Sequence, residues 1–271
     1  MTSTPAPFRF GVVAPVTTDA PTWHDQLRRI ADQGYSTLLM PDVPGWQPAP
    51  ATALAVAASL TDLRVGTWVY ASPLRPAWST AWEAHSLTEL TGGRFDLGIG
   101  TGRPGINDLV RELGDDALTP GERITRIRET VTALRELDGP DRHTPVVMAV
   151  RGPKARALAA EVADMVTFAM TPDDRREVVE QFARDLRAIR DIPLALHVSV
   201  VGDTVAPFMT SPDTNPAALR AADSLAILPD DPAAAAEELQ RRREESGFTY
   251  VVIGANAADM LAPVVARLAG N

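Results

Sequence analysis

Three short stretches of this 271-residue sequence combine residue types that could bind a ligand or act on one. In the first, Gly98, Gly100 and Gly102 alternate at the end of an apolar run. Glycines at this spacing let the backbone approach a flat ligand closely and leave amide groups exposed. A tight strand exit has the same pattern, so the glycines alone indicate a ligand site only weakly.

The second stretch is Arg151-Gly152-Pro153-Lys154, directly before an amphipathic segment. A helix that begins with a glycine and nearby cations favours an anion at its N-terminus. Pro153 is also an ordinary first-turn residue, so plain capping explains the pattern as well. Lys154 is the only lysine in the chain, and its location here favours a phosphate ligand.

The third candidate is Asp42, a carboxylate that follows a short apolar run; an N-cap or a loop ion pair is an equal alternative. The four histidines, His24, His85, His143 and His197, lack the spacing of metal ligands, so we expect structural roles for them and no metal. The chain has no cysteine, which excludes thiolate catalysis and cysteine-ligated metals.

Short apolar runs alternate with amphipathic stretches along the whole chain, which is typical of repeated βα units. Eight strands are expected, near 8–15, 37–40, 64–70, 95–101, 145–150, 165–170, 194–200 and 250–254. The expected helices cover 21–34, the stretch from about 50 to 60, 77–90, 122–137, 153–163, 172–189, 233–245 and 257–269. Residues 102–121 read as a loop, and 202–229 as an irregular insertion after strand seven with a short helix near 217–222.

This count predicts one domain over 1–271, a closed (β/α)8 TIM barrel. An open doubly wound sheet is the alternative, but closure removes exposed sheet edges. Active sites of such barrels lie at the C-terminal ends of the strands. We therefore expect Asp42, the segment 68–72, the segment 100–103 and the segment 151–154 to share one rim of the barrel.

Composition limits the kinds of partner that the protein can bind and the cellular compartment in which it is expected. A net charge of −9 argues against nucleic acid or an anionic membrane as the main partner. No apolar run approaches the roughly 20 residues of a membrane span, and residues 1–7 lack the features of a secretory signal, so we expect a cytoplasmic protein. Trp78 and Trp82 are expected to pack on the barrel, and the run 241–245 to form a solvated helix face.

The motif Leu-x-x-Leu-x-Gly-Gly-Arg-Phe at 87–95, followed by Gly98-x-Gly100-x-Gly102, resembles the luciferase-like monooxygenase family. That family includes bacterial luciferase, FMN-dependent monooxygenases and enzymes that use the deazaflavin coenzyme F420. Further similar stretches are 34–42, 63–75 and 146–164, and the end of the chain, 238–268, resembles actinobacterial deazaflavin-type members. The resemblance covers most of the chain and implies a luciferase-like TIM barrel.

The resemblance also implies positions for a cofactor site. The third strand of the family carries a non-prolyl cis peptide bond in a bulge against the flavin ring, and the matching pair here is Trp68-Val69. Asp42 matches a carboxylate that contacts the cofactor. The remaining implied cofactor-binding residues are Ala71, Gly100, Thr101, Gly102, Arg151, Gly152, Pro153 and Lys154.

The sequence departs from the family's alcohol and sugar-phosphate dehydrogenases at three places. These enzymes have a histidine after the aspartate, a tryptophan shortly beyond and a glutamate after strand four; here the positions hold Val43, Trp46 shifted by one residue, and Arg103. Valine cannot exchange a proton, so alcohol oxidation is disfavoured. Asp42 and Arg103 are expected to orient the ring and the substrate, and Trp46 to form an apolar wall.

These features favour an F420-dependent oxidoreductase that transfers hydride to a small organic substrate, as a reductase of an activated C=C or C=N bond. Thr101 favours F420 over FMN within the resemblance. One alternative is a two-component FMN monooxygenase that receives reduced FMN from a separate reductase and uses O2. Another is a barrel that binds flavin without turnover. The resemblance also implies a possible homodimer through the early helices.

Overall fold

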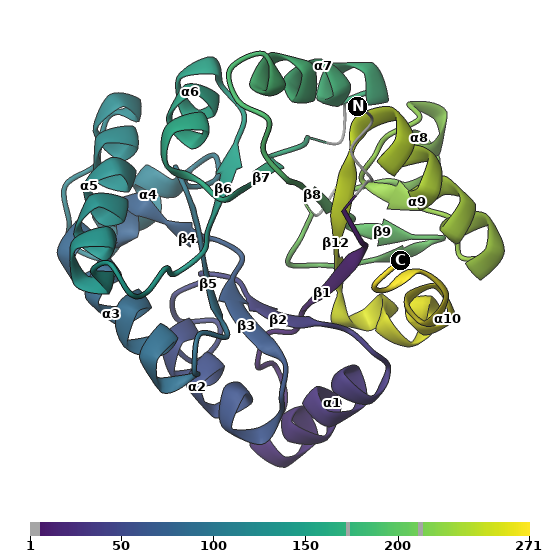
Figure 1. The fold of residues 1–271 in the computed structure, drawn as a ribbon, viewed down its shortest axis with the longest axis horizontal. Coiled ribbons are helices and arrows are strands. Elements are labelled where there is room, and N and C mark those ends of the chain that lie inside the picture. The colour runs from purple at the N-terminus through teal and green to yellow at the C-terminus, as the bar shows by residue number, and fades with distance from the viewer. Residues whose placement is uncertain (1–5, 172–173, 211–213) are drawn as a thin grey trace.

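The chain folds into a closed parallel barrel surrounded by helices (Figure 1). The computed structural model describes residues 6–171, 174–210 and 214–271. β1 pairs in parallel with both β2 and β12, and β3 pairs with β5, so the strand order closes on itself. The barrel strands are β1 (Arg9–Val13), β2 (Thr37–Met40), β3 (Arg64–Thr67) continued by β4 (Tyr70–Ala71), β5 (Phe95–Gly100), β6 (Val146–Val150), β7 (Met165–Phe168), β8 (Leu194–His197) and β12 (Phe248–Gly254).

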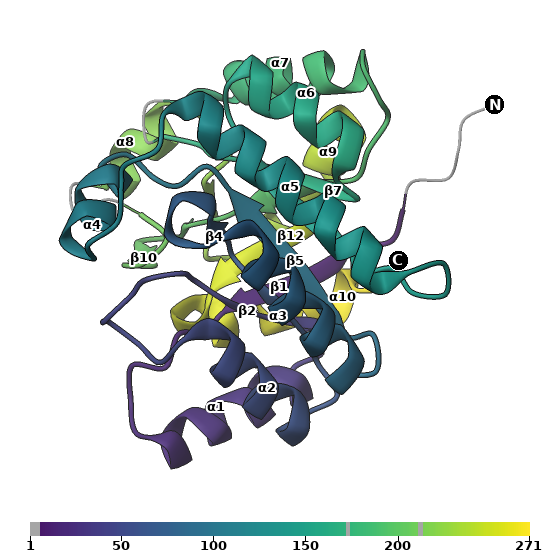
Figure 2. The same ribbon diagram turned by 90° about the vertical axis from the view of Figure 1, so that its left-hand side faces the viewer.

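This arrangement confirms the predicted (β/α)8 barrel, and each expected strand has a counterpart in the structure. Helices lie outside the strands, and the first described residues lie at the same end of the barrel as the C-terminus (Figure 2). The helices are α1 (Ala20–Asp32), α2 (Pro50–Leu60), α3 (Ala77–Leu90), α4 (Ile106–Glu112), α5 (Pro120–Asp138), α6 (Pro153–Val162), α7 (Arg176–Arg187), α8 (Pro216–Ala221), α9 (Pro232–Ser246) and α10 (Ala258–Leu268). The expected start of the helix at 172 lies outside the described residues.

Local capping explains where several helices begin. Asp19 accepts a hydrogen bond from the Thr22 amide and caps α1. Thr119 and Glu122 form a reciprocal capping box, so α5 begins at Pro120, two residues before the predicted start.

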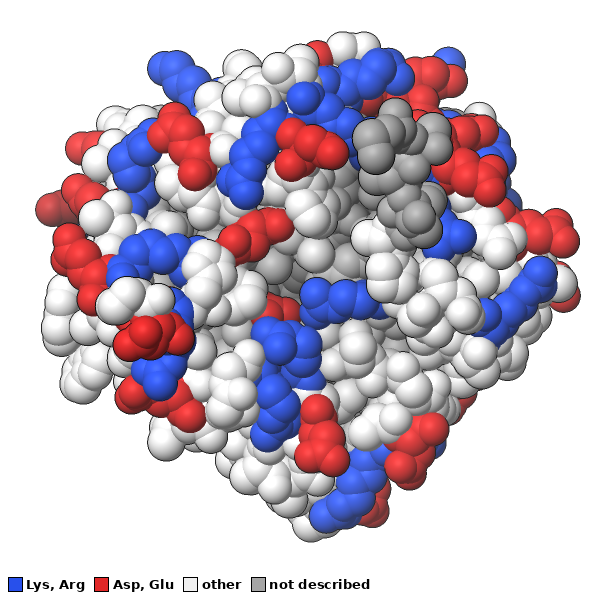
Figure 3. Space-filling view, viewed as in Figure 1, with Lys and Arg blue, Asp and Glu red and all other residues white. Residues whose placement is uncertain are grey.

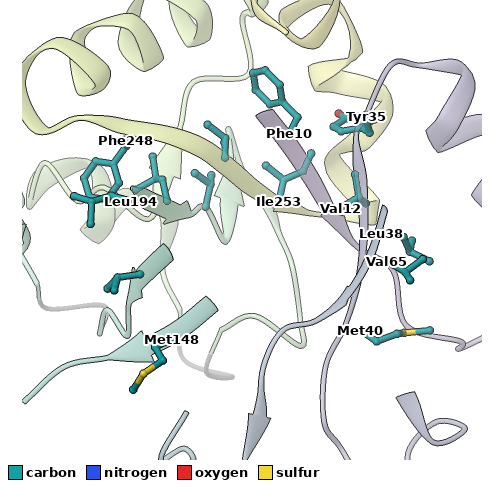
Figure 4. Close-up of a cluster of buried hydrophobic side chains, with 14 of the residues drawn as sticks. Phe10, Val12, Tyr35, Leu38, Met40, Val65, Met148, Leu194, Phe248 and Ile253 are labelled. Atoms are coloured by element: carbon teal, nitrogen blue, oxygen red, sulfur yellow. The ribbon is translucent and has the colours of Figure 1, made fainter. Parts of the chain in front are cut away.

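Successive side chains of each barrel strand point to opposite faces, so they belong to two different apolar clusters. The larger cluster lies between strands and helices, and includes Phe10, Leu38, Met148 and Phe248 (Figure 4). The smaller cluster fills the inside of the barrel and consists of Val13, Leu39, Trp68, Val147, Ala195, Tyr250 and Val252. Apolar burial on both faces is what closed parallel sheets require.

The N-terminal ends of the strands are closed by charged groups. Asp96 in β5 pairs with Arg64 of β3, and Arg9 of β1 approaches the same carboxylate at 3.5 Å. Figure 3, seen from the same side as Figure 1, shows basic side chains in the hollow at the centre of this face. These charged groups pair with one another and close this end of the barrel. The functional site is therefore expected at the opposite end.

The arginine of the family-like motif is part of the scaffold. Arg94 donates hydrogen bonds to the carbonyls of Thr91, Thr61, Leu63 and Ala58, at 3.1, 3.0, 2.7 and 2.8 Å. Two of these acceptors lie at or just beyond the C-terminal end of α2, where carbonyls lack helical partners. The side chain therefore joins the ends of α2 and α3 to the start of β3.

The loops contain more regular structure than expected. α4 lies within 102–121, which was predicted as a loop. The insertion after β8 forms a small sheet of β9 (Val200–Val201), β10 (Thr204–Val205) and β11 (Ile227–Leu228) as well as the predicted short helix α8. Two-residue strands give no sequence period, so the alternation of apolar residues could not reveal them.

Two surface predictions were wrong. Trp78 and Trp82 are 58% and 56% exposed, so they do not pack on the barrel. Their rings lie against one another, with centroids 5.3 Å apart and planes tilted by 39°. Arg242 is only 2% exposed and donates to the carbonyls of Leu225 and Ile227. The run 241–245 is therefore no uniform solvated face, because Arg242 holds the inserted sheet against α9.

Glu238 compensates the buried charge of Arg242. It accepts hydrogen bonds from Arg242 at 2.6 Å and from Arg176 at 2.8 Å. Burial alone would raise the pKa of Glu238, but the neighbouring guanidinium groups outweigh burial and lower it to about 2. Burial also lowers the pKa of Arg242 to about 10, so Glu238 offsets only part of that cost.

Candidate active site at the C-terminal ends of the strands

The third strand is interrupted where the cofactor face was predicted. Gly66 pairs with Asp96 and Tyr70 with Ile99, so β3 and β4 contain one more residue than β5 over the same stretch. The Trp68-Val69 peptide bond in this bulge is cis, as the resemblance implied. Trp68 belongs to the cluster inside the barrel and Val69 packs against it, although consecutive residues of a regular strand face opposite sides.

The glycines of β5 make room for the bulge. A Cβ atom on Gly98 would lie 1.9 Å from the carbonyl oxygen of Thr67, so no other residue fits there without a backbone shift. The Thr67 hydroxyl donates to the Gly98 carbonyl at 2.7 Å and accepts from its amide at 2.9 Å. A Cβ atom on Gly100 would lie 3.2 Å from Val69 and from Ala149. This rim of the barrel is therefore lined by very small residues.

His197, at the end of β8, is joined to the bulge. Its Nδ1 accepts a hydrogen bond from the Trp68 indole N–H at 2.9 Å, and the two rings are nearly parallel, at 5°. Its Nε2 lies 3.1 Å from the carbonyl oxygen of Met209. Burial lowers the pKa of His197, and the Met209 carbonyl offsets this only in part. Sequence reasoning assigned His197 a structural role; its position at a strand end was the signal that could have placed it in the site.

Asp42 lies at the expected rim but is bound within the protein. Its carboxylate accepts hydrogen bonds from Arg75 at 2.8 and 2.9 Å and from the Ala71 amide at 3.1 Å. The Asp42 side chain is 3% exposed. Burial alone would lower the pKa of Arg75, but Asp42 more than compensates and raises it. The geometry thus gives Asp42 and Ala71 a role in holding the bulge, and Arg75 is the partner that sequence reasoning missed.

In the predicted phosphate segment, one cation is ion-paired and the other has no partner within the part of the chain that the structure describes. Arg151 forms a bidentate pair with Asp174, at 2.6 and 2.9 Å, which raises the pKa of the guanidinium. Gly152 is the N-cap of α6 and Pro153 occupies its first turn, as predicted. Lys154 is exposed and makes no hydrogen bond or ion pair with any residue that the structure describes. β5 and β6 are adjacent, so this helix start lies beside Gly100.

The residues after β5 form the floor of the same rim. Thr101 is partly exposed, and its carbonyl accepts a hydrogen bond from Arg123 at 3.3 Å. Gly102 has a φ of 84°, a backbone conformation that glycine adopts readily. The Arg103 side chain is exposed and unpaired within the described ranges. Arg103 can therefore reach a ligand at the rim, whereas Arg123 supports the loop.

The loop after β2 and the insertion after β8 meet across the barrel mouth. The ring centroids of Trp46 and Phe208 are 6.0 Å apart, and Trp46 is 46% exposed. Phe208 and Met209 also pack against the cluster inside the barrel. The predicted wall residue Trp46 is thus paired with an aromatic residue 162 positions away, which no local sequence pattern indicated.

A surface cavity of about 570 Å³ lies away from this rim, at the opposite ends of β6 and β7. It is lined by Arg135, His143, Asp164 and Arg190. Asp164 there already pairs with Arg135 and His143. We therefore place the candidate site at the C-terminal rim, where exposed cations, small residues and the bulge meet. No group of three or more potential metal ligands occurs among residues 6–171, 174–210 and 214–271.

The fold and rim define a TIM-barrel protein with a bulged third strand, a small-residue wall and a cationic helix start. The chain belongs to the luciferase-like monooxygenase family, whose model matches residues 6–228. A 5,10-methylenetetrahydromethanopterin reductase of Methanolobus tindarius is 26% identical over 172 residues, which cover 56% of this chain and 51% of that protein. The chain thus spans about half the length of that relative.

Solved structures share the fold at low identity. The coenzyme F420-dependent tetrahydromethanopterin reductase of Methanopyrus kandleri superposes with a TM-score of 0.69 at 18% identity, covering 98% of this chain and 99% of that one. The oxygenating component of 3,6-diketocamphane monooxygenase of Pseudomonas putida, in complex with FMN, gives 0.65 at 13% identity, covering 96% and 95%. These similarities establish the fold. No described helix has the length and apolarity to cross a membrane.

Proposed function

We propose that this protein is an F420-dependent oxidoreductase that reduces an activated C=C or C=N bond of a small organic substrate. The observation that supports it most is the meeting of the Trp68-Val69 bulge with the glycines of β5 beside a cationic helix start. The matched relative named as a methylenetetrahydromethanopterin reductase is consistent with a reductase.

The residues of the rim fit a flat cofactor that carries a phosphate. Gly100, Ala149 and Thr167 are in register on neighbouring strands, so this part of the wall carries only small side chains. The Thr167 hydroxyl is buried and has no hydrogen-bond partner among the described residues, so a polar edge of a ligand could satisfy it. The free amides at the start of α6 and Lys154 suit the phosphate.

When bound, reduced F420 supplies a hydride. The residues of this chain would position it and exclude water: Trp68 and Val69 form one wall, and Asp42 with Arg75 holds the bulge in place. Trp46 covers the mouth, and the exposed Arg103 orients the substrate or its charge. Arg151 keeps the phosphate loop in position through Asp174.

The test is a cofactor titration of the purified protein, followed by F420 fluorescence, with FMN in parallel. We expect F420 to bind and Lys154→Ala to weaken binding by roughly tenfold, as loss of one charge-assisted hydrogen bond does. Arg267→Ala removes an exposed cation on α10 and is the matched control. Binding of FMN without F420 would refute the proposal, and unchanged affinity in Lys154→Ala would remove the phosphate assignment.

The second candidate is an FMN monooxygenase, which the family description favours. Such an enzyme would need reduced FMN from a separate reductase. A hydroxylated product formed from reduced FMN and O2 would establish it. Tight binding of either cofactor without turnover across a substrate panel would instead support a barrel that binds flavin without catalysis.

We also infer that two copies pair through the outer faces of α2 and α3. α2 contains no charged residue, and the exposed apolar side chains on this face are Val56, Trp78, Trp82 and Leu90. α2 adds no charge to this face, and Glu89 on α3 is paired with Arg142, so two copies can meet here despite the net charge of −9. Light scattering of the wild-type protein should give the mass of a dimer, and the double variant Trp78→Ser, Trp82→Ser should give the mass of a monomer. Ile189→Ser, on another face, is the control and should remain a dimer. A wild-type monomer would refute the pairing.

A further inference from the structure

The hydrogen bonds of His197 determine which of its nitrogens carries the proton. An indole N–H can only donate, so the Nδ1 that receives Trp68 is unprotonated. A carbonyl oxygen can only accept, so the Nε2 that faces Met209 carries the hydrogen. The imidazole is therefore neutral and presents an N–H donor from Nε2.

Protonation of this neutral ring is disfavoured. A second proton would have to enter at Nδ1, where it would meet the Trp68 indole N–H. Trp68, Met209 and the paired strand residue Val252 surround the ring and are all uncharged. Burial also lowers the pKa of His197. The neutral ring thus donates one hydrogen bond, and it is partly exposed.

The acceptor of this hydrogen bond does not belong to the barrel. Met209 lies in the insertion after β8, within a turn whose Met209 amide and Thr210 hydroxyl bond to the Ala206 carbonyl, each at 3.0 Å. Phe208 and Met209 are only partly buried against the inside of the barrel. An sp² carbonyl oxygen from a surface segment therefore occupies the position in front of His197, next to the bulge.

We propose that His197 Nε2–H binds the carbonyl oxygen of an α,β-unsaturated carbonyl substrate, and that the Met209 carbonyl holds this position until the substrate replaces it. The proposal rests on the proposed function and names the class of substrate within it. A neutral donor suits a neutral carbonyl better than a carboxylate, which a cation would bind more strongly.

The proposed reduction of the C=C bond requires no proton from His197. Hydride from the reduced cofactor forms a C–H bond at the β-carbon, the C=C π electrons form a new double bond to the carbonyl carbon, and the carbonyl π electrons move to its oxygen. The Nε2–H hydrogen bond stabilises the negative oxygen, as donors aimed at a developing oxyanion do. A proton from water then completes the saturated product at the α-carbon.

The first experiment needs no cofactor. Protein labelled with nitrogen-15 histidine is titrated with cyclohex-2-en-1-one and, as the control that lacks an acceptor, with cyclohexene; His197→Gln assigns the signal. We expect one unprotonated and one protonated ring nitrogen in His197, with the protonated one shifted by the ketone alone. A His197 signal that saturating ketone leaves unchanged, or that cyclohexene shifts equally, would overturn the proposal.

The second experiment uses the enzyme loaded with reduced F420. His197→Phe should keep the F420 affinity within about twofold and lower kcat/KM for the enone by about 100-fold, the usual loss for one oxyanion donor. His197→Gln retains an N–H and should recover part of it, and the wild-type profile should be flat between about pH 7 and pH 8.5. Wild-type kcat/KM in His197→Phe would overturn the proposal. If the ketone shifts the His197 signal but the protein binds no F420, the proposed function is refuted, whereas the assignment of His197 as a hydrogen-bond donor to the ketone stands.

Discussion

Asp42→Ala should destabilise the protein, because this residue holds the bulge from within. The substitution removes the acceptor of two Arg75 hydrogen bonds and of the Ala71 amide. Removing one partner of a buried ion pair costs about 3–5 kcal/mol. Arg75 is 22% exposed, lies 3.5 Å from Glu83 and stacks 3.7 Å above the Tyr70 ring, so it keeps part of its stabilisation. We expect a loss of about 2–3 kcal/mol.

The assay is thermal and urea unfolding of matched variants. A loss of this size should lower Tm by roughly 4–10 °C in a chain of this length. Asp42→Asn keeps the size of the side chain and one acceptor, so it should lose less. Asp108→Ala breaks a pair with Arg111 in which both side chains are at least 60% exposed, and it should change stability by less than about 0.5 kcal/mol.

The outcome also separates two roles for Asp42. If it holds the bulge, stability and cofactor affinity should fall together in Asp42→Ala. An Asp42→Ala variant as stable as the wild type that has lost F420 binding would refute this reasoning and favour the direct cofactor contact implied by the family resemblance.

Three further predictions concern the scaffold. Gly98→Ala should destabilise the fold by more than about 2 kcal/mol, because its Cβ would lie 1.9 Å from the Thr67 carbonyl. In Gly121→Ala the new Cβ would make only an ordinary contact of 4.0 Å with the Thr119 hydroxyl, so this variant should be near neutral in urea unfolding. Arg94→Met should lower the free energy of unfolding by about 2–4 kcal/mol in the same measurement, since four carbonyls lose their donor. Neutral surface substitutions usually change this free energy by less than about 0.5 kcal/mol, so a loss of that size would exclude the scaffold role. Glu238 has a lowered pKa, so its contribution of roughly 3 kcal/mol is complete above about pH 4.5 and is lost as the pH falls towards 2. Glu238→Gln should remove that part of the pH dependence, and an unchanged acid profile would contradict the assignment.

The barrel could be predicted from sequence because its signal is local. Apolar runs and helical periods recur along the chain, and the strand-end rule placed Asp42, Trp68 and Gly100 on one rim. The resemblance supplied the cis bond at Trp68-Val69, which no local pattern encodes. The small strands β9 to β11 and the helix α4 were missed because they are too short to show a period.

The partners within the site could not be predicted, because they are distant in sequence. Arg75 lies 33 residues from Asp42, and Arg151 pairs with Asp174 only because their strand ends are adjacent in the barrel. Whether a charged residue at a strand end can bind a ligand depends on whether such a distant partner already pairs with it. Lys154 has no partner among the described residues and Arg151 is ion-paired, although the sequence shows both as cations at one helix start.

The extra residue of the third strand has a consequence for how this barrel can diversify. Trp68 and Val69 are adjacent in the chain and line the same wall, so two neighbouring codons control one surface of the site. Substitutions there can reshape that surface, but a single deletion would restore regular alternation and turn one of the two side chains outward. It would also move Ala71 away from Asp42 and Gly100. Selection can therefore vary the identity of these residues only while it keeps their number, and the hydrogen bond from Trp68 to His197 further restricts the first of them.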